Sequence, residues 1–251
     1  MKYPNMTVNI FVRRHMQDGS MTVVPCTMSL LPPEEADDAV RIHDEVAHGL
    51  SEDIFIPSSR EEIERYLGPE GLAVGIKHEG RLISLRTAIT GEDWVRYTAN
   101  GMGLPPGEAE NAACTGFCVV HREFRGNNVQ FLSQYYAENL IASHRDAILT
   151  TVSPHNIFSL QNVLNCNYRI VALNEIYGGH LRYVLKKEFR SEFPLWTHWH
   201  MQIPIRDIER QRRALAAGAV GYKLVRKPSG MHVLYAAASR TPCSAKDLRI
   251  D

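Results

Sequence analysis

The sequence predicts a mixed α/β protein of the α+β kind, with a mostly antiparallel central sheet flanked by helices and a small C-terminal α/β appendage. Two pairs of apolar runs, LAVGIK with RLISLRTAIT and RIVALNEI with LRYVLKK, are joined by short turns typical of antiparallel hairpins. A strand-like run that ends at Val120 leads through a glycine-containing turn into a helical pattern. After Phe189 the composition changes to an aromatic segment bounded by prolines, which indicates that the C-terminal appendage begins there.

The composition favours a soluble, cytoplasmic protein. With 251 residues and 44% hydrophobic content, the chain can bury a full core. Lys+Arg and Asp+Glu are both 28, and no basic block stands out, so we expect neither a nucleic-acid nor a membrane partner. A membrane-spanning apolar run and a signal-peptide profile are both missing. The odd, scattered set of cysteines indicates reduced thiols: Cys26, Cys114, Cys118, Cys166 and Cys243.

The first half of the chain predicts one strand, two helices and a hairpin. Residues 1–20 are ambiguous between a short strand and a loose extension. A strand over Val23–Leu31 should end at a proline pair, and a helix with acidic residues in its first turn follows. The capping-box pattern SREE at 59–62 opens a second helix. Residues 91–110 are rich in glycine and proline without a period, so we expect a functional or disordered connection there.

The second half predicts alternating strands and helices, then a separate subdomain. The expected elements are a strand over 113–120, a helix to Ser143, a strand over 147–152, a helix over 158–164 and a hairpin around 177–180. Beyond them, DIERQRRALAAG predicts a capped helix, and GYKLVRKPSGMHVLYAAA predicts a further hairpin. We therefore expect an N-terminal extension over 1–22, a main domain over 23–189 and a helix-hairpin subdomain over 190–251.

The turn Arg125-Gly126-Asn127-Asn128 indicates an anion site. A strand that runs through a glycine turn into a helix directs free backbone N–H groups at one point, where the helix dipole adds positive charge. Gly126 leaves room for approach, the asparagines tolerate left-handed backbone angles, and Arg125 can add a charge-assisted hydrogen bond. The alternative is an ordinary strand–helix connection, because short glycine motifs match by chance.

This turn, together with TTVSPHN (150–156) and NIFSLQNVLNCNY (156–168), resembles the GNAT superfamily of acyl-CoA-dependent N-acyltransferases. Members have a strand, an Arg/Gln-x-x-Gly-x-Gly/Ala pyrophosphate loop that opens a helix, a second strand, and an asparagine that heads another helix. The resemblance covers roughly Val23 to Phe189. It implies a GNAT-like fold, acetyl-CoA or another acyl-CoA as cosubstrate, and no metal. The residues implied in binding are Cys118, Val119, Val120, Arg125, Gly126, Asn127, Asn128, Val129, Gln130, Asn156 and Ser159.

The sequence departs from the family pattern at several positions. Asn128 and Gln130 stand where the family prefers small residues, although asparagine can adopt a glycine-like conformation. Asn167-Tyr168 replaces a Gly-Phe-like pair. Val163 stands where many members have a tyrosine that protonates the leaving thiolate, so the usual acid is missing.

The catalytic groups are therefore harder to assign. The strand before the turn carries no carboxylate, so we expect Glu110, ahead of Glu108 and His121, as the general base, with a solvated loop carboxylate as the alternative. By resemblance His180 faces the acceptor pocket, with a surface turn histidine as the alternative. Tyr177 or Tyr183 could replace the missing acid, although tyrosines in strands usually serve packing.

Two other kinds of site are disfavoured. His198-Trp199-His200 places two imidazoles on one strand face, but no cysteine or carboxylate stands at a helpful spacing for zinc. The Gly-x-Ser-x-Gly elbow of α/β serine hydrolases is missing.

The leading function is transfer of an acetyl group from acetyl-CoA to a primary amine of a small molecule. One alternative is a transferase that uses a longer acyl-CoA or an acyl-carrier protein as donor. Another is a non-catalytic acyl-CoA-binding module. The variable loops that choose the acceptor leave its identity open, and the oligomeric state is open as well.

Overall fold

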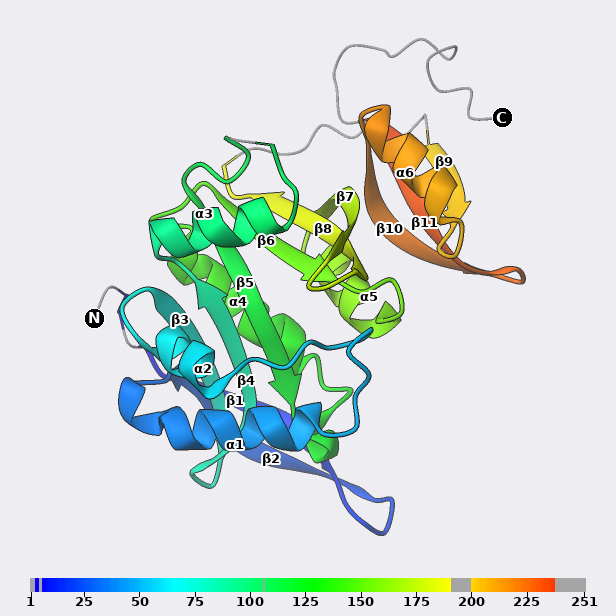
Figure 1. The fold of residues 1–251 in the computed structure, drawn as a ribbon. Helices are drawn as coiled ribbons and strands as arrows, with labels where there is room; N and C mark the ends of the chain where they lie inside the picture. The colour runs from blue at the N-terminus through cyan, green and yellow to red at the C-terminus, as the bar shows by residue number, and fades with distance from the viewer. Residues whose placement is uncertain (1–2, 5, 106, 191–199, 238–251) are drawn as a thin grey trace. The chain divides into compact units, whose positions relative to one another are not determined.

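Antiparallel strands dominate the chain in a computed structural model that describes residues 3–4, 6–105, 107–190 and 200–237. The chain divides into two compact units, Met1–Thr98 with Asn111–Arg145, and Ala99–Glu110 with Asp146–Asp251. Every strand pairing found within the two units is antiparallel. Helices flank these strands (Figure 1), so the predicted fold class is confirmed.

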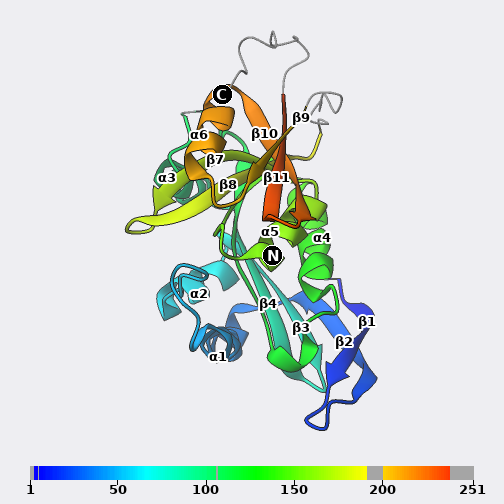
Figure 2. The ribbon, with the colours of Figure 1, turned by 90° about the vertical axis from the view of Figure 1, so that its right-hand side faces the viewer.

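The first unit is built on five strands in the order β1-β2-β3-β4-β5. Helices α1 and α2 cover one face of β3 and β4, and α4 covers the other (Figure 2). Apolar side chains of both layers, such as Ile42, Val74 and Leu85, are fully buried between them. The elements are β1 (Val8–His15), β2 (Met21–Leu30), η1 (Pro33–Glu35), α1 (Ala36–Ala47), α2 (Arg60–Leu67), β3 (Gly71–His78), β4 (Arg81–Ile89), β5 (Ala112–Val120), η2 (Arg122–Phe124) and α4 (Val129–Ile141).

Where the structure describes the second unit, its strands lie in the order β6-β8-β7-β10-β11-β9. Gly221 of β10 pairs with Ile170 of β7, so the C-terminal strands extend the sheet formed by β6, β8 and β7. Helix α6 packs on β7 and β10. The elements are β6 (Ala147–Val152), α5 (Ile157–Asn165), β7 (Arg169–Ile176), β8 (His180–Glu188), β9 (His200–Pro204), α6 (Ile208–Ala216), β10 (Ala219–Lys227) and β11 (Gly230–Ala237).

Most predicted elements are confirmed. The hairpins β3–β4, β7–β8 and β10–β11 form as their apolar runs predict. The capping box at the start of α2 is present, because Ser59 Oγ accepts from the Glu62 N–H and the Glu62 side chain accepts from the Ser59 N–H. The ambiguous residues before position 20 contain β1, which pairs with β2 along its whole length. The predicted boundaries at residues 22 and 189 stay a prediction.

The expectation for residues 91–110 is wrong in its first half, because Glu92–Gly101 forms helix α3. Glu92 and Asp93 stand in the first turn, where negative charge suits the helix dipole. Val95, Ala99 and Met102 follow at spacings of four and three residues and are buried. The glycines and prolines that follow obscured this helical period.

Candidate active site

The turn before α4 has the backbone conformation that its residue types permit. Arg125 is extended, Gly126 has φ +75°, and Asn128 is left-handed with φ 57°. Helix α4 begins at Val129, so its first N–H groups have no acceptor within the helix. A Cβ atom added to Gly126 would meet no atom within 4 Å, so the space beside the turn is open to a ligand. This donor set and this open space fit the diphosphate of CoA.

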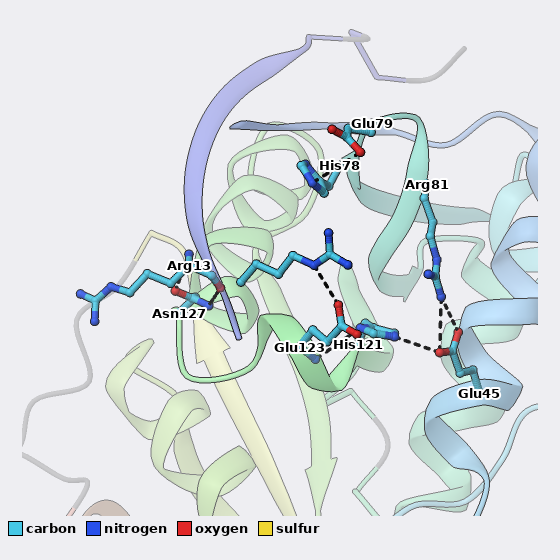
Figure 3. Close-up of polar contacts among 9 residues, drawn as sticks. Arg13, Glu45, His78, Glu79, Arg81, His121, Glu123 and Asn127 are labelled. Atoms are coloured by element: carbon cyan, nitrogen blue, oxygen red, sulfur yellow. Dashed lines mark hydrogen bonds and ion pairs between the residues drawn. The ribbon is translucent and has the colours of Figure 1, made fainter. Parts of the chain in front are cut away.

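The Asn127 side chain faces strand β1 (Figure 3). Its Oδ1 accepts from the Arg13 N–H at 2.9 Å, and its Nδ2 donates to the Arg13 carbonyl at 2.6 Å and to the Phe124 carbonyl at 3.1 Å. Arg125 Nε donates to the Val120 carbonyl at 3.1 Å. The Asn127 side chain and Arg125 Nε therefore hold the turn in shape, and the backbone N–H groups at the start of α4 can donate to an anion.

Strand β5 contains a bulge just before the predicted pantetheine residues Cys118, Val119 and Val120. Cys118 pairs with Arg86 and Thr115 with Ala88, so Gly116 and Phe117 together lie opposite Thr87. The Phe117 N–H donates to Thr87 Oγ1 at 2.9 Å. A Cβ atom on Gly116 would lie 2.3 Å from that oxygen, so only glycine fits there. A lone glycine in a strand was the sequence signal for this bulge.

A buried arginine, which the sequence patterns did not reveal, joins the sheet to the start of α4. Arg86 is 3% exposed. Its Nε donates to Ser133 Oγ at 3.1 Å, and its Nη2 donates to the Gln130 carbonyl at 2.9 Å. Cys118 Sγ lies 3.9 Å from the same Ser133 hydroxyl. This cluster fixes the first turn of α4 on the strands, which keeps the turn's N–H groups in place.

In the second unit, the motif that begins at Asn156 heads helix α5. Asn156 Oδ1 accepts from the Ser159 N–H at 3.1 Å, which is the helix cap that was the alternative to a ligand contact. Val163 is buried in the same helix. At its end, Asn167 has φ 73° and Tyr168 is fully buried. Asparagine thus supplies here the left-handed angle that glycine supplies in the family pattern.

Two of the candidate bases are already engaged in contacts. Glu108 Oε2 lies 2.7 Å from Lys186 Nζ, in an ion pair. His121 is buried; its Nδ1 accepts from the Glu123 N–H, and its Nε2 lies 2.9 Å from Glu45 Oε1 (Figure 3). Glu110 is exposed in the loop before β5. His180, at the start of β8, is partly exposed. Glu110 therefore remains the preferred candidate base.

The two tyrosines considered as acids have different surroundings. Tyr177 is 48% exposed, and its hydroxyl lies 3.3 Å from Thr151 Oγ1 on β6. Tyr183 is fully buried and donates to Gln211 Oε1 at 2.6 Å. Burial raises the pKa of Tyr183 far above its ordinary value. The structure gives Tyr183 a packing role and leaves Tyr177 accessible.

The described residues contain neither a metal-binding cluster nor a membrane-spanning helix. Among the described residues, no group of three or more His, Cys, Asp or Glu side chains is arranged to hold a metal ion. His198 and Trp199 of the His198-Trp199-His200 segment lie outside the described residues. In the same part of the chain, no helix is long and apolar enough to cross a membrane.

The comparisons with known proteins bear on the fold. Neither protein-family profiles nor curated proteins match the sequence. Among solved structures, the GNAT domain of S. lividans PAT superposes with a TM-score of 0.50 at 13% identity, over 74% of this chain and 99% of that one. An N-acetyltransferase from Staphylococcus aureus Mu50 superposes with a TM-score of 0.50 at 10% identity, over 65% of this chain and 97% of that one. The chain therefore has the fold of the GNAT acetyltransferases.

Proposed function

We propose that this chain is an acyl-CoA-dependent N-acyltransferase that moves an acetyl group from acetyl-CoA to a primary amine of a small molecule. The observation that carries the proposal is the turn Arg125–Gln130, which opens α4 with a left-handed glycine, a left-handed asparagine and free helix N–H groups in a GNAT fold. Two of the solved structures with this fold are a GNAT domain and an N-acetyltransferase.

Each candidate residue has a definite task in this proposal. Bound acetyl-CoA would supply an activated acyl group as a thioester. The backbone N–H groups of the turn would bind its diphosphate, and Asn156 with the β5 backbone would bind the pantetheine arm. Glu110 would take the proton from the acceptor ammonium, because only the neutral amine is a nucleophile. Tyr177 would return a proton to the leaving sulfur, since its hydroxyl is accessible.

The proposed acid is helpful but dispensable. An alkyl thiol has a pKa near the cysteine value of ~8.5, so the thiolate is a tolerable leaving group at neutral pH. Losing the acid should therefore slow turnover by roughly 10²-fold, the low end for general acid catalysis. The rate should rise with pH as the acceptor amine loses its proton.

The first test is ligand-dependent stability of the Gly126→Val variant. CoA at a hundredfold excess over its Kd should stabilise the wild type by about 2.7 kcal/mol. A β-branched residue at φ +75° is strained and fills the space beside the turn, so the variant should lose this stabilisation. Gly230→Val is the matched control, because Gly230 also has a positive φ and nothing within 4 Å.

Melting temperatures with and without CoA and acetyl-CoA give the readout. The control should lose intrinsic stability but keep the ligand-induced shift. If millimolar CoA does not change the melting temperature of the wild type, the protein does not bind CoA and the proposal is refuted. For the reaction itself, release of free thiol from acetyl-CoA across a panel of amines separates an enzyme from a binding module.

A further inference from the structure

Strand β1 is attached directly to the turn that would bind the diphosphate. Both backbone groups of Arg13 take part in this contact (Figure 3). The Arg13 N–H donates to Asn127 Oδ1 at 2.9 Å, and the Arg13 carbonyl accepts from Asn127 Nδ2 at 2.6 Å. The side-chain amide thus pairs with the edge of β1 as a neighbouring strand would. The backbone of Arg13 is therefore held next to Asn127.

The next two residues of β1 strengthen this attachment. Arg14 Nε donates to Glu123 Oε2 at 2.9 Å. His15 Nε2 lies 3.1 Å from the Arg125 carbonyl. Three consecutive residues of the N-terminal hairpin therefore contact the segment 123–127, which contains most of the turn.

The charge around the turn is positive although the whole chain has a net charge of +0. Arg13, Arg14, Arg122 and Arg125 lie on β1 or on the segment 122–125, and Glu123 is the acidic residue among them. The hydrogen bond from Arg14 lowers the pKa of Glu123, so this carboxylate is ionised and paired with Arg14. Three arginines are left without a carboxylate in this part of the described structure.

Arg13 is the arginine best placed to meet a second anionic group. It is exposed, and within the described residues its guanidinium makes no hydrogen bond or ion pair. Its side chain extends past Asn127 (Figure 3). Arg125, by contrast, bonds back to the Val120 carbonyl through Nε.

We propose that Arg13 is a specificity-determining residue that binds the 3′-phosphate of CoA. The proposal rests on the proposed function, because it assumes that the diphosphate lies on the turn. The 3′-phosphate sits on the same ribose whose 5′-oxygen carries the diphosphate, so it lies one sugar away from the turn. An arginine matches a phosphate in both charge and fork geometry. The site would then favour CoA over dephospho-CoA and over a carrier-protein phosphopantetheine, which lacks this group.

The test is isothermal titration calorimetry of CoA and dephospho-CoA with four proteins: wild type, Arg13→Gln, Arg13→Lys and Arg122→Gln. The wild type should bind CoA about tenfold more tightly than dephospho-CoA, which corresponds to one charge-assisted contact. Arg13→Gln should bind both ligands equally, at the wild-type affinity for dephospho-CoA. Arg13→Lys should keep part of the preference, and raised salt should weaken it.

Arg122→Gln removes the same charge from the same neighbourhood and should keep the preference. Equal losses in Arg122→Gln and Arg13→Gln would overturn the assignment, because they would show a general field effect. A wild type without preference, or an Arg13→Gln variant that keeps it, would overturn the assignment as well. If neither ligand binds any of the proteins, the proposed function itself fails, and the role of Arg13 fails with it.

Discussion

Asn128 and Asn167 have positive φ angles, which glycine adopts more often than other residues. Their φ values are 57° and 73°, and each stands at an end of a helix. Asparagine reaches this region at low cost because its short polar side chain can hydrogen-bond locally. Asn167 does so, since its Oδ1 accepts from Arg169 Nη2 at 3.1 Å. Both asparagines therefore hold left-handed backbone angles that glycine can also adopt.

Tyr177 and Tyr183 should respond differently to loss of their hydroxyl groups. If Tyr177 is the acid, Tyr177→Phe should lower kcat by roughly 10²-fold at steady KM, because its accessible hydroxyl would no longer protonate the thiolate. Tyr183→Phe should leave kcat unchanged and cost about 1 kcal/mol of stability, since Gln211 loses a buried donor. Steady-state kinetics and urea unfolding measure the two effects. Full activity in both variants would show that water supplies the proton.

Asn156 caps α5, and a matched exchange can separate this cap from a ligand contact. Asn156→Ser keeps a capping oxygen but shortens its reach, so stability should change by only a few tenths of a kcal/mol. CoA should bind more weakly if the amide contacts the pantetheine arm. Asp207→Ser is the control, because Asp207 caps α6 in the same way. If calorimetry finds equal CoA affinity in both variants, Asn156 only caps α5 and does not contact the ligand.

At the scale of elements, the bulge in β5 depends on one buried hydroxyl. Thr87 is fully buried and accepts the Phe117 N–H. Thr87→Val keeps the shape but leaves that N–H without an acceptor, so the free energy of unfolding should fall by about 1–3 kcal/mol. Thr87→Ser keeps the acceptor and should lose only about 1 kcal/mol for its methyl group. Urea unfolding of both variants measures the difference, and a valine variant as stable as the wild type would contradict it.

Local patterns predicted the elements well, whereas contacts between distant segments were beyond them. The hairpin β3–β4 follows from two apolar runs and a turn, and the α2 cap follows from Ser59 and Glu62. Nothing local in the sequence indicates that Asn127 bonds to Arg13, 114 residues away. The engagement of Arg86 with the start of α4 is equally non-local. The roles of these side chains depend on the folded sheet, which brings distant segments together, so the sequence alone does not indicate them.

At the scale of the whole molecule, buried acids limit stability at high pH. Tyr183 and Tyr235 both donate to Gln211 Oε1, and burial raises the pKa of each above the ordinary 10.0. Burial also raises the pKa of the Cys114 thiol from 9.0 to about 12. These groups stay protonated in the folded protein at a pH where they ionise in the unfolded chain. The folded state then binds more protons, so the free energy of unfolding falls as pH rises.

The loss should begin near pH 9 through Cys114 and steepen above pH 10 through the two tyrosines, by about 1.4 kcal/mol per pH unit for each ionising group. Well below pH 9 these three groups add no slope, because both states hold their protons. The double variant Tyr183→Phe, Tyr235→Phe should start less stable at pH 8, because Gln211 loses both donors, but should lose stability more gently between pH 10 and 11. Tyr97→Phe, which removes a hydroxyl from a residue that is 79% exposed, should retain the wild-type slope. Urea unfolding at half-unit steps from pH 8 to 11 gives the slopes, and a double variant as steep as the wild type would show that these tyrosines ionise without unfolding the protein.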